Sequence, residues 1–426
     1  MCSTVSLLNR FKTEIIPKVL KISNKENYKI KCMESSINDT FSLSSVHFID
    51  ITLVNNDKIN LVIKIPPNSS DRLEQFDLKQ LFRNEIIFYE NFSNHVAVPK
   101  FFYGLAAEDV SKNVIVLENV TKSGFKMCPA EYHMPFRYVI NAVRELGNFH
   151  AAHYVFKERN PDKFKKIVCD IKESWFVEGN WLADKIKIVG NRPVEWLRKI
   201  NYDSNFCNKM EYYLGDAFNM IILDAIKPVE PLAVLCHGDF TRTNMLFREL
   251  SCADDGDDSG VDNSDVEEKK RLEVMLIDFG MIRYASPSID LSTLLYLNCT
   301  SEDRKNRFDE IFLAYHDALL DYLTKAELID LSRYSFEKML EDYKRRAAYG
   351  FIVALYFLPF LYGFGDDPDK NNDTTASSST TATDTSTKDN KDLTTITWAG
   401  GDAMSAVFAD MLLELKDTGC LNHIIL

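Results

Sequence analysis

The sequence predicts an α+β protein of two lobes, a small β-rich N-lobe and a large, mainly helical C-lobe. Short runs of β-branched and aromatic residues, separated by turn residues, dominate the first part of the chain. Stretches with apolar residues at helical spacing dominate the remainder. With 426 residues, 46% of them apolar, the chain is long enough for two packed lobes. We place the N-lobe at residues 1–119 and the C-lobe at 120–426.

The N-terminal elements are a helix followed by strands. Residues 5–22 carry apolar side chains at helical spacing, which predicts a helix. Strands are predicted over 28–33, 46–54 and 59–65, the last of them closed by two prolines. The segment 34–42 is predicted as a loop. It contains no Gly, so it is not a glycine-rich phosphate lid, although its backbone amides and hydroxyls could still meet a phosphate.

Lys64 is the unusual residue of the third strand, because it stands between Ile63 and Ile65. A Lys on an inner strand needs a partner for its ammonium group. The helix predicted over 71–92 offers Glu85 at the edge of its apolar face. We therefore expect an ion pair between Lys64 and Glu85. Taken alone, a solvated strand-end Lys and an exposed helix Glu would be the more common arrangement.

Two apolar strands in the second half of the chain end in acidic motifs. The first runs into His237-Gly238-Asp239, with Asn244 five residues after the Asp, and the second delivers Asp278-Phe279-Gly280. A phosphoryl-transfer site needs one carboxylate to accept the proton of the substrate hydroxyl. It also needs an amide and a second carboxylate to hold magnesium ions on the ATP phosphates. The pattern therefore predicts Asp239 as the base and Asn244 and Asp278 as metal ligands.

The C-lobe is predicted to be helical over 136–156, through most of 160–232, and over 303–325, 326–363 and 397–417. His150 and His153 have a spacing found in metal sites, but no third ligand accompanies them, so we assign them a structural role. The aromatic segment 160–232 is mostly core and is a candidate for part of an acceptor pocket. Asp290 lies in an apolar run and is expected to accept hydrogen bonds around the predicted catalytic stretch, residues 237–244.

Two segments, 252–270 and 365–395, are predicted to be disordered insertions, because they are polar and nearly free of apolar residues. The first contains eight acids and no base between Cys252 and Glu268. Without them the formal net charge of −13 becomes −5. The remaining body is only mildly acidic, which argues against nucleic-acid binding. The acidic cluster lacks the spacing of a calcium loop.

The nine Cys form no Cys-x-x-Cys pair, which fits reduced thiols better than a metal site or a disulfide framework. No secretory signal is evident at the N-terminus, and the most apolar run, 351–362, is too short to cross a bilayer. These features predict a soluble, cytoplasmic protein without a membrane or nucleic-acid partner. We expect it to be a monomer.

Six motifs appear in an order that resembles the ecdysteroid-kinase-like family, also called CHK-kinase-like, over about residues 27–363. The motifs are Ile63-Lys64, Phe82-x-x-Glu85-x-x-Phe88-Tyr89, Val116-Leu117-Glu118-Asn119, His237-Gly238-Asp239-x4-Asn244, Ile277-Asp278-Phe279 and Ser286-Pro287-x-x-Asp290-Leu291. This family has a protein-kinase-like fold and is related to choline and aminoglycoside kinases. His-Gly-Asp, in place of the Arg-Asp of protein kinases, points to the small-molecule branch.

The resemblance implies an ATP-dependent kinase that phosphorylates a hydroxyl of a small molecule, which for the family's namesakes is an ecdysteroid. It implies that Asp239 is the base, that Asn244 and Asp278 bind Mg²⁺, and that Lys64 with Glu85 positions the ATP phosphates. The strand 113–118 would be the kinase hinge, with main-chain groups around Glu118 and Val120 against the adenine. An ordinary strand and turn would look the same in the sequence. Gly280 departs from many relatives, which have Gln there.

Three functions remain open at this point, beside a protein kinase, which the motifs support less. The first is a kinase for an ecdysteroid or similar apolar polyol, which the aromatic helical segment and the nearly neutral body favour. The second is a kinase for a choline-like, aminoglycoside-like or foreign alcohol. The third is a non-catalytic pseudokinase that acts as a binding module. It is disfavoured because Lys64, Glu85, Asp239, Asn244 and Asp278 are all present.

Overall fold

The computed structural model describes residues 4–25, 27, 29–38, 43–67, 77–179, 181–250, 271–328, 330–364 and 399–425. They form two compact units, each assembled from three stretches of the chain. Unit 1 comprises Met1–Met127, Asn160–Ser174 and Thr243–Ile282, and unit 2 comprises Cys128–Arg159, Trp175–Arg242 and Arg283–Leu426. The predicted α+β class is confirmed. The predicted lobe boundary between residues 119 and 120 stays a prediction.

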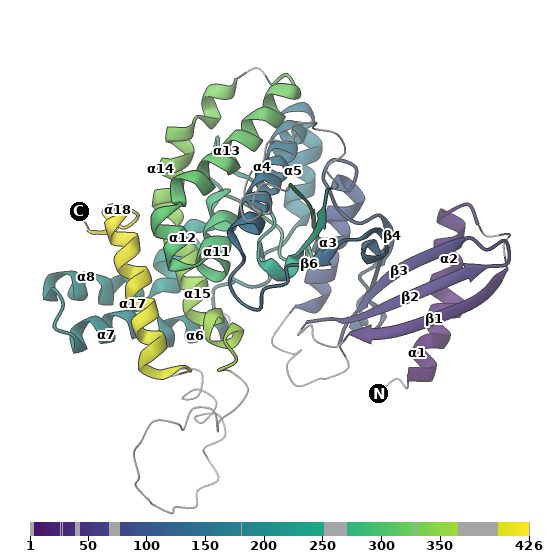
Figure 1. Cartoon of the computed structure of the whole chain (residues 1–426), viewed down its shortest axis with the longest axis horizontal. Coiled ribbons are helices and arrows are strands. Elements are labelled where there is room, and N and C mark those ends of the chain that lie inside the picture. The colour runs from purple at the N-terminus through teal and green to yellow at the C-terminus, as the bar shows by residue number, and fades with distance from the viewer. Residues whose placement is uncertain are drawn as a thin grey trace, which may run out of the picture. The chain divides into compact units, whose positions relative to one another are not determined.

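Unit 1 is built on an antiparallel sheet with the strand order β1-β2-β3-β5-β4 (Figure 1). Its strands are β1 (Ile30–Asn38), β2 (Ser45–Leu53), β3 (Lys58–Ile65), β4 (Phe101–Leu105) and β5 (Val114–Glu118). Along β2 and β3 buried residues alternate with more exposed ones, because successive side chains of a strand point to opposite faces. The sheet therefore has an apolar face and a more polar one.

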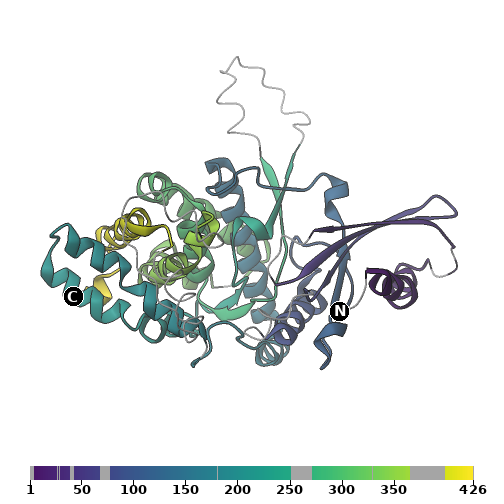
Figure 2. The same cartoon turned by 90° about the horizontal axis from the view of Figure 1, so that it is seen from below.

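The N-terminal helices cover the apolar face of this sheet, as Figure 2 shows for the purple helix beside the strands. They are α1 (Thr4–Arg10), the π-helical turn η1 (Phe11–Ile15) and α2 (Ile16–Ile22). Phe11 and Ile16 are fully buried against strand residues such as Leu61 and Ile63. The side chain of Lys64 points to the opposite face from its two Ile neighbours, which is why a Lys is tolerated between them.

Unit 1 also contains a smaller sheet with the order β6-β8-β9. Its strands are β6 (Lys126–Met127), β8 (Met245–Glu249) and β9 (Leu272–Leu276). β8 and β9 pair in register from Met245 opposite Leu276 to Glu249 opposite Leu272. Both predicted insertions, 252–270 and 365–395, lie outside the described residues.

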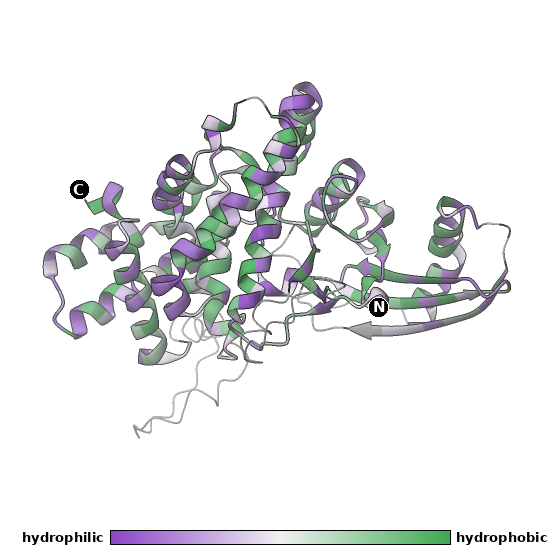
Figure 3. Ribbon diagram, turned by 45° about the horizontal axis from the view of Figure 1, so that its top comes forward, coloured by the Kyte–Doolittle hydropathy of each residue, from purple (hydrophilic) through white to green (hydrophobic). Residues whose placement is uncertain are grey.

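Unit 2 is mainly helical, and its helices show hydrophobic residues alternating with hydrophilic ones, as expected when one side packs inward (Figure 3). A short antiparallel pair, β7 (Val234–Cys236) and β10 (Arg283–Ala285), lies among them. Its longer helices are α4 (Phe136–Arg159), α6 (Trp181–Gly190), α7 (Arg192–Lys199), α8 (Ser204–Leu214), α11 (Ser288–Asn298), α13 (Phe308–Lys325), α14 (Phe336–Arg346), α15 (Ala348–Leu361) and α17 (Gly401–Asp417).

Two close helix contacts organise this unit. α4 packs along α13, and α15 packs along α11. A Cβ at Gly147 would come within 2.4 Å of the Tyr315 carbonyl oxygen, and one at Gly350 within 2.3 Å of the Ser292 carbonyl oxygen. Only glycine therefore permits these helices to approach so closely.

The C-terminal helix α17 is fixed to α7 by a buried arginine. The guanidinium of Arg192 donates to the carbonyl oxygens of Ala399 and Gly401 at 3.2 and 3.0 Å, and to Ser405 Oγ at 3.3 Å. Because Arg192 is only 2% exposed, these acceptors replace the water that its guanidinium gives up.

Two predicted elements are wrong in their bounds. Residues 34–38 belong to β1, since they pair with β2 from Glu34 opposite Asp50 to Asn38 opposite Val46, and residues 39–42 are not described. The single helix predicted over 326–363 is instead the short turn η7 (Leu331–Tyr334), α14 and α15. Ser335 caps α14 by accepting from the Lys338 amide and so marks a helix start inside the predicted span.

The helix predicted over 71–92 is described from Leu78, as α3 (Leu78–Phe92), while residues 71–76 lie outside the description. The single helix predicted over 303–325 is present as two helices, α12 (Ser301–Asn306) and α13, and the other predicted helices are present with shifted ends. None of the helices that the structure describes is both long and apolar enough to cross a membrane.

Candidate active site

The polar face of the main sheet carries an ion pair between Lys64 on β3 and Glu85 on α3. The distance from Lys64 Nζ to Glu85 Oε2 is 2.7 Å, and the two side chains are 13% and 2% exposed. α3 begins after Asp77, whose carboxylate accepts from the Gln80 amide and caps the helix. The ion pair predicted from the unusual Lys is therefore present.

Asp278 completes a triad with these two residues. Its Oδ1 lies 2.8 Å from Lys64 Nζ, and its side chain is 44% exposed. Asp278 has a φ of 67°, a left-handed conformation that is rare for a residue with a side chain. Such backbone conformations persist where the surroundings hold them, which often happens at functional sites.

The residues after Asp278 fasten this segment to α3. The Phe279 ring stacks on Phe88 with centroids 3.7 Å apart and meets Tyr89 edge-on at 5.5 Å. The amide of Phe279 donates to the Glu85 carboxylate. The side chain of Asn84, on α3, donates to the Gly280 carbonyl oxygen at 3.1 Å. One turn of α3 thus positions both Glu85 and Asp278.

The electrostatics of the triad are set by burial and by its excess of acid. Burial and the negative charge of Asp278 raise the pKa of Glu85 to about 7, against the opposing effect of Lys64. Asp278 and Glu85 raise the pKa of Lys64, which stays protonated, even though burial acts in the opposite direction. Two carboxylates around one ammonium leave an excess negative charge that a cation at the exposed side of Asp278 would offset.

Asn244 lies at the same end of the β8–β9 hairpin as Asp278. It directly precedes β8, and its carbonyl oxygen accepts from the Ile277 amide at 3.0 Å. An amide oxygen and a carboxylate are the hard oxygen donors that Mg²⁺ prefers. Asp278 uses Oδ1 for Lys64 and remains partly open to solvent, so this donor set fits a magnesium ion.

The predicted hinge residues close the strand β5. The Glu118 amide donates to the Lys100 carbonyl oxygen at 2.9 Å, and the next residue, Asn119, caps the turn η4 (Val120–Ser123) through Thr121. Val120 is 5% exposed and packs with Phe125 and Leu246. These contacts fix the course of the main chain here, and the adenine contact of Glu118 and Val120 stays a prediction.

In unit 2, Asp290 of α11 holds the start of the catalytic stretch that follows β7. Its two carboxylate oxygens accept from the amides of His237 and Gly238 at 2.7 and 2.8 Å. These hydrogen bonds and the neighbouring His150 lower the pKa of the Asp290 carboxyl, although burial alone would raise it. The predicted structural role of Asp290 is confirmed. Asp239, the predicted base, follows directly and is partly exposed.

His150 belongs to this holding network. Its Nε2 lies 3.1 Å from Asp290 Oδ2, and its Nδ1 lies 2.9 Å from the Tyr315 hydroxyl. His150, Cys236 and Asp290 bring potential ligand atoms within 4.8 Å of one another, which sequence reasoning did not foresee. Both ring nitrogens and both carboxylate oxygens already have partners inside the protein, so the arrangement is explained without a metal ion.

Sequence reasoning missed a second residue that holds the catalytic stretch. The side chain of Asn298, at the end of α11, accepts from the Arg242 amide at 3.0 Å, and its carbonyl oxygen accepts from the Met134 amide at 2.8 Å. Asn298 is 1% exposed. A buried Asn at the end of the apolar run 294–297 is the signal that could have identified it.

Comparison with known proteins assigns a family to the chain. No curated protein matches it. Among solved structures, it is similar to the GDP complex of a point mutant of aminoglycoside 2′-phosphotransferase IIIa, with 13% identity, a TM-score of 0.40, and 82% of this chain and 90% of that one covered. It is also similar to a microcompartment-associated aminopropanol kinase, with 13% identity, a TM-score of 0.38, and 93% and 94% covered.

The model of the ecdysteroid kinase-like family matches residues 43–328, about two thirds of the chain. The matched region contains Lys64, Glu85, Asp239, Asn244 and Asp278. The family match supports the assignment of the chain as a small-molecule, kinase-like phosphotransferase. The chain belongs to the ecdysteroid kinase-like family.

Proposed function

We propose that the protein is an ATP-dependent kinase that transfers the γ-phosphoryl group to a hydroxyl of a small molecule. The observation that carries the proposal is the position of Lys64 between Glu85 and Asp278, at 2.7 and 2.8 Å. In kinases, a Lys that is held by a Glu of the neighbouring helix pairs with the nucleotide phosphates, and the Asp of the Asp-Phe-Gly motif binds the metal. A pseudokinase is disfavoured because none of these groups has been lost.

Each residue has a role in this proposal. Lys64 neutralises phosphate charge, and Glu85 holds the Lys64 side chain in position. Asn244 and Asp278 would hold a magnesium ion, which would supply positive charge to the phosphate oxygens. Asp239 accepts the proton of the attacking hydroxyl as its oxygen bonds to phosphorus and the bond to ADP breaks. Main-chain groups at Glu118 and Val120 hydrogen-bond the adenine.

We further propose that the acceptor is an apolar alcohol, such as an ecdysteroid or a similar polyol. Partly exposed aromatic side chains gather on α15 and α6, where Trp181 and Tyr356 have ring centroids 6.2 Å apart and Tyr356 and Phe357 4.9 Å apart. Such rings supply an apolar contact surface. A choline-like or aminoglycoside-like substrate would instead call for several carboxylates among these rings.

Contacts within unit 2 connect this aromatic group to the catalytic stretch. Arg242 Nη1 donates to the Ala130 carbonyl oxygen at 3.0 Å. Two residues further on, the Tyr132 ring meets Tyr362, next to the end of α15, at 5.1 Å, and His133 Nε2 lies 3.0 Å from the Tyr362 hydroxyl. Burial lowers the pKa of His133, so its ring is neutral at neutral pH and adds no charge to this surface.

The test is phosphorylation of a mixed panel of sterol, choline-like and glycosidic alcohols with ATP and magnesium, read by mass spectrometry. We expect a mass gain of one phosphate on an apolar alcohol. Asp239→Asn should lower turnover by roughly 100- to 10,000-fold and leave ATP affinity unchanged, because only the base is lost. Asp216→Asn, an exposed carboxylate of the same unit, is the matched control. Equal turnover in the two variants would contradict the mechanism.

The sequence-based expectations of a monomer in the cytoplasm remain predictions.

A further inference from the structure

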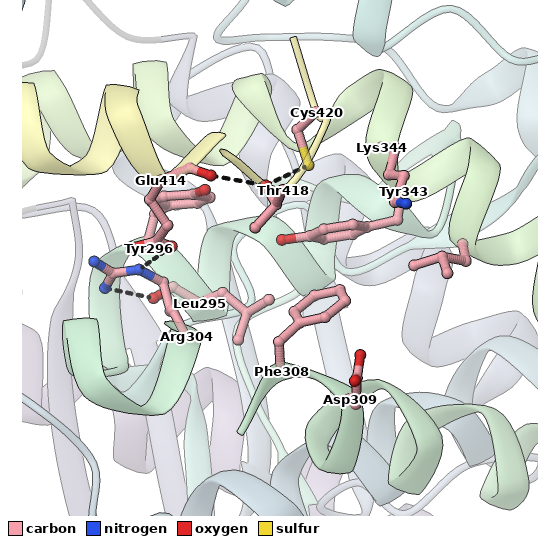
Figure 4. Close-up of a pocket in the computed structure, with 11 residues that line it drawn as sticks. Leu295, Tyr296, Arg304, Phe308, Asp309, Tyr343, Lys344, Glu414, Thr418 and Cys420 are labelled. Atoms are coloured by element: carbon pink, nitrogen blue, oxygen red, sulfur yellow. Dashed lines mark hydrogen bonds and ion pairs between the residues drawn. The ribbon is translucent and has the colours of Figure 1, made fainter. Parts of the chain in front are cut away.

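Unit 2 contains a pocket of about 220 Å³ that none of the proposed kinase residues lines. Its walls come from α11, α12 (Ser301–Asn306), α13, α14 and α17 and from the residues that follow α17 (Figure 4). Lys344, Asp309 and Thr418 are exposed and form the rim, while Tyr296 and Tyr343 lie deeper and are buried. The pocket is therefore a hollow with a polar rim and a largely aromatic interior.

Three polar atoms of the pocket lining have no hydrogen-bond partner among the described residues, and one of them, Glu414 Oε2, is itself fully buried. The hydroxyls of Tyr296 and Tyr343, which are 3% and 4% exposed, hydrogen-bond to no residue that the structure describes. Glu414 is 5% exposed, and its Oε2 is buried and has no hydrogen-bond partner among the residues that the structure describes. Leaving a buried polar atom unpaired costs about 1 to 3 kcal/mol, so Glu414 Oε2 indicates that something binds there, and the two tyrosine hydroxyls offer a ligand further hydrogen bonds.

The charge around these atoms is already balanced. Arg304 Nε lies 2.9 Å from Glu414 Oε1, and both side chains are 5% exposed or less. The Arg304 guanidinium also donates to the Cys299 carbonyl oxygen at 2.7 Å and lies over the Tyr296 ring at 5.1 Å. The ion pair between Arg304 and Glu414 leaves the buried end of the pocket without net charge. A charged ligand would therefore lose its hydration without gaining a counterion. A neutral hydrogen-bond donor suits Glu414 Oε2 better.

The interior also limits the size and shape of a ligand. Tyr343 extends across the pocket with Phe308 beneath it, and their ring centroids are 5.0 Å apart (Figure 4). A cavity of roughly 150 Å³ lined by apolar residues accommodates benzene. A volume of about 220 Å³ therefore accommodates one ring with a small polar substituent.

We propose that this pocket is a second ligand site, and that it binds a small, neutral, single-ring alcohol or phenol. The ring packs against Phe308 and Tyr343, and the hydroxyl bonds to the unpaired oxygens of Tyr296, Tyr343 and Glu414. The site does not depend on the proposed kinase activity, because its residues are separate from those that would transfer phosphate.

Phenol and toluene form a matched pair of probes, since they differ by one hydroxyl. Binding to the full-length protein is measured by saturation-transfer NMR and by titration. We expect phenol to bind at least about tenfold more tightly than toluene, which corresponds to the net value of one or two hydrogen bonds.

Three variants place the binding in this pocket. Leu340→Trp fills its volume at a half-buried position and should abolish phenol binding. Tyr343→Phe keeps the ring and removes one hydroxyl, so it should weaken phenol binding several-fold and leave toluene binding unchanged. Tyr212→Phe, a tyrosine that is 68% exposed, is the control. Circular dichroism checks that each variant is folded.

Loss of phenol binding in Leu340→Trp, together with the selective loss in Tyr343→Phe, would support the proposal. Absence of phenol binding to the wild-type protein would overturn it, since the unpaired oxygens would then be satisfied by water alone. Equal affinities for phenol and toluene, or phenol binding that persists in a folded Leu340→Trp variant, would also overturn it.

Discussion

Asp278 in unit 1 and Asp290 in unit 2 carry the same carboxylate group in opposite environments. Asp278 bonds to Lys64 through Oδ1 and is 44% exposed, whereas Asp290 is 1% exposed and both of its oxygens accept backbone amides. An acid that is accessible to solvent can bind a ligand. An acid whose oxygens are saturated can only hold the protein together. The comparison separates an acid to which we assign a metal-binding role from one that positions the chain.

The largest expected effect comes from Asp278→Ala. Loss of the metal ligand should lower phosphate transfer by about 1,000-fold, or about 4 kcal/mol of transition-state stabilisation. It should also weaken binding of the magnesium–nucleotide complex, which calorimetry measures. Glu273→Ala, on the neighbouring strand β9, is the control and should retain both. Wild-type nucleotide affinity in Asp278→Ala would remove the distinction between the two acids.

Asp290→Ala should act on stability. It leaves the His237 and Gly238 amides without acceptors, and we expect the free energy of unfolding to fall by about 2 to 4 kcal/mol. Urea unfolding followed by Trp fluorescence reports on this unit, because the three Trp residues that the structure describes, Trp175, Trp181 and Trp196, belong to unit 2. Asp410→Ala, exposed on α17, should stay within about 0.5 kcal/mol of the wild type. A wild-type midpoint for Asp290→Ala would show that its hydrogen bonds are dispensable.

The pH dependence of stability should have opposite signs at the two clusters. The pKa of Glu85 is raised from 4.5 to about 7, so the folded protein binds this proton more tightly than the unfolded chain does. The Glu85 contribution therefore falls as pH rises from about 4.5 to about 7, by on the order of 1 to 3 kcal/mol. The pKa of Asp290 is lowered, so its contribution is present above its ordinary value of 3.8 and is lost as pH falls.

Glu85→Gln removes the first of these titrations and should flatten the pH profile between about 4.5 and 7. The measurement is hydrogen exchange of α3 peptides under mild urea, without metal, at several pH values. Asp290→Asn should leave this part of the profile unchanged. A Glu85→Gln profile that still falls over this range would assign the titration to other groups.

The glycines beside the two clusters should give the smallest effects. Gly238 has a φ of +83°, so Gly238→Ala should destabilise the fold by about 1 kcal/mol or more. A Cβ at Gly280 would meet nothing closer than the Leu81 carbonyl oxygen at 3.4 Å, and its φ lies outside the left-handed region. Gly280→Ala should therefore shift thermal unfolding little. Equal losses of stability in the two variants would contradict this account, because they would show that a Cβ at Gly280 does not fit between its neighbours.

The charged residues of the site could be predicted from the sequence because each stood out locally. Lys64 lay between two Ile residues, and Asp278 and Asp239 followed apolar strands. The contact of Asn298 with Arg242 could not be predicted, because it joins residues 56 positions apart through one amide side chain. The extension of β1 through Asn38 depends on its partner strand, and polar residues such as Ser35 and Ser36 gave no local sign of it.

The second pocket could not be predicted from the sequence either, because five helices from different parts of the chain line it. Tyr296 on α11 and Glu414 on α17 line the same cavity only because the two helices belong to the same folded unit. The start of α14 is different, since Ser335 before Phe336 is a capping signal that the sequence did contain.

The most direct test of the central claim compares two lysines of the same strand. Lys64 is held by Glu85 and Asp278, whereas Lys58 at the start of β3 is exposed. Phosphate transfer from ATP to the panel of alcohols should fall by at least about 100-fold in Lys64→Met, because the charge that offsets the phosphates is lost. It should be unchanged in Lys58→Met. Equal transfer by these two folded variants would contradict the assignment of the triad as the ATP site.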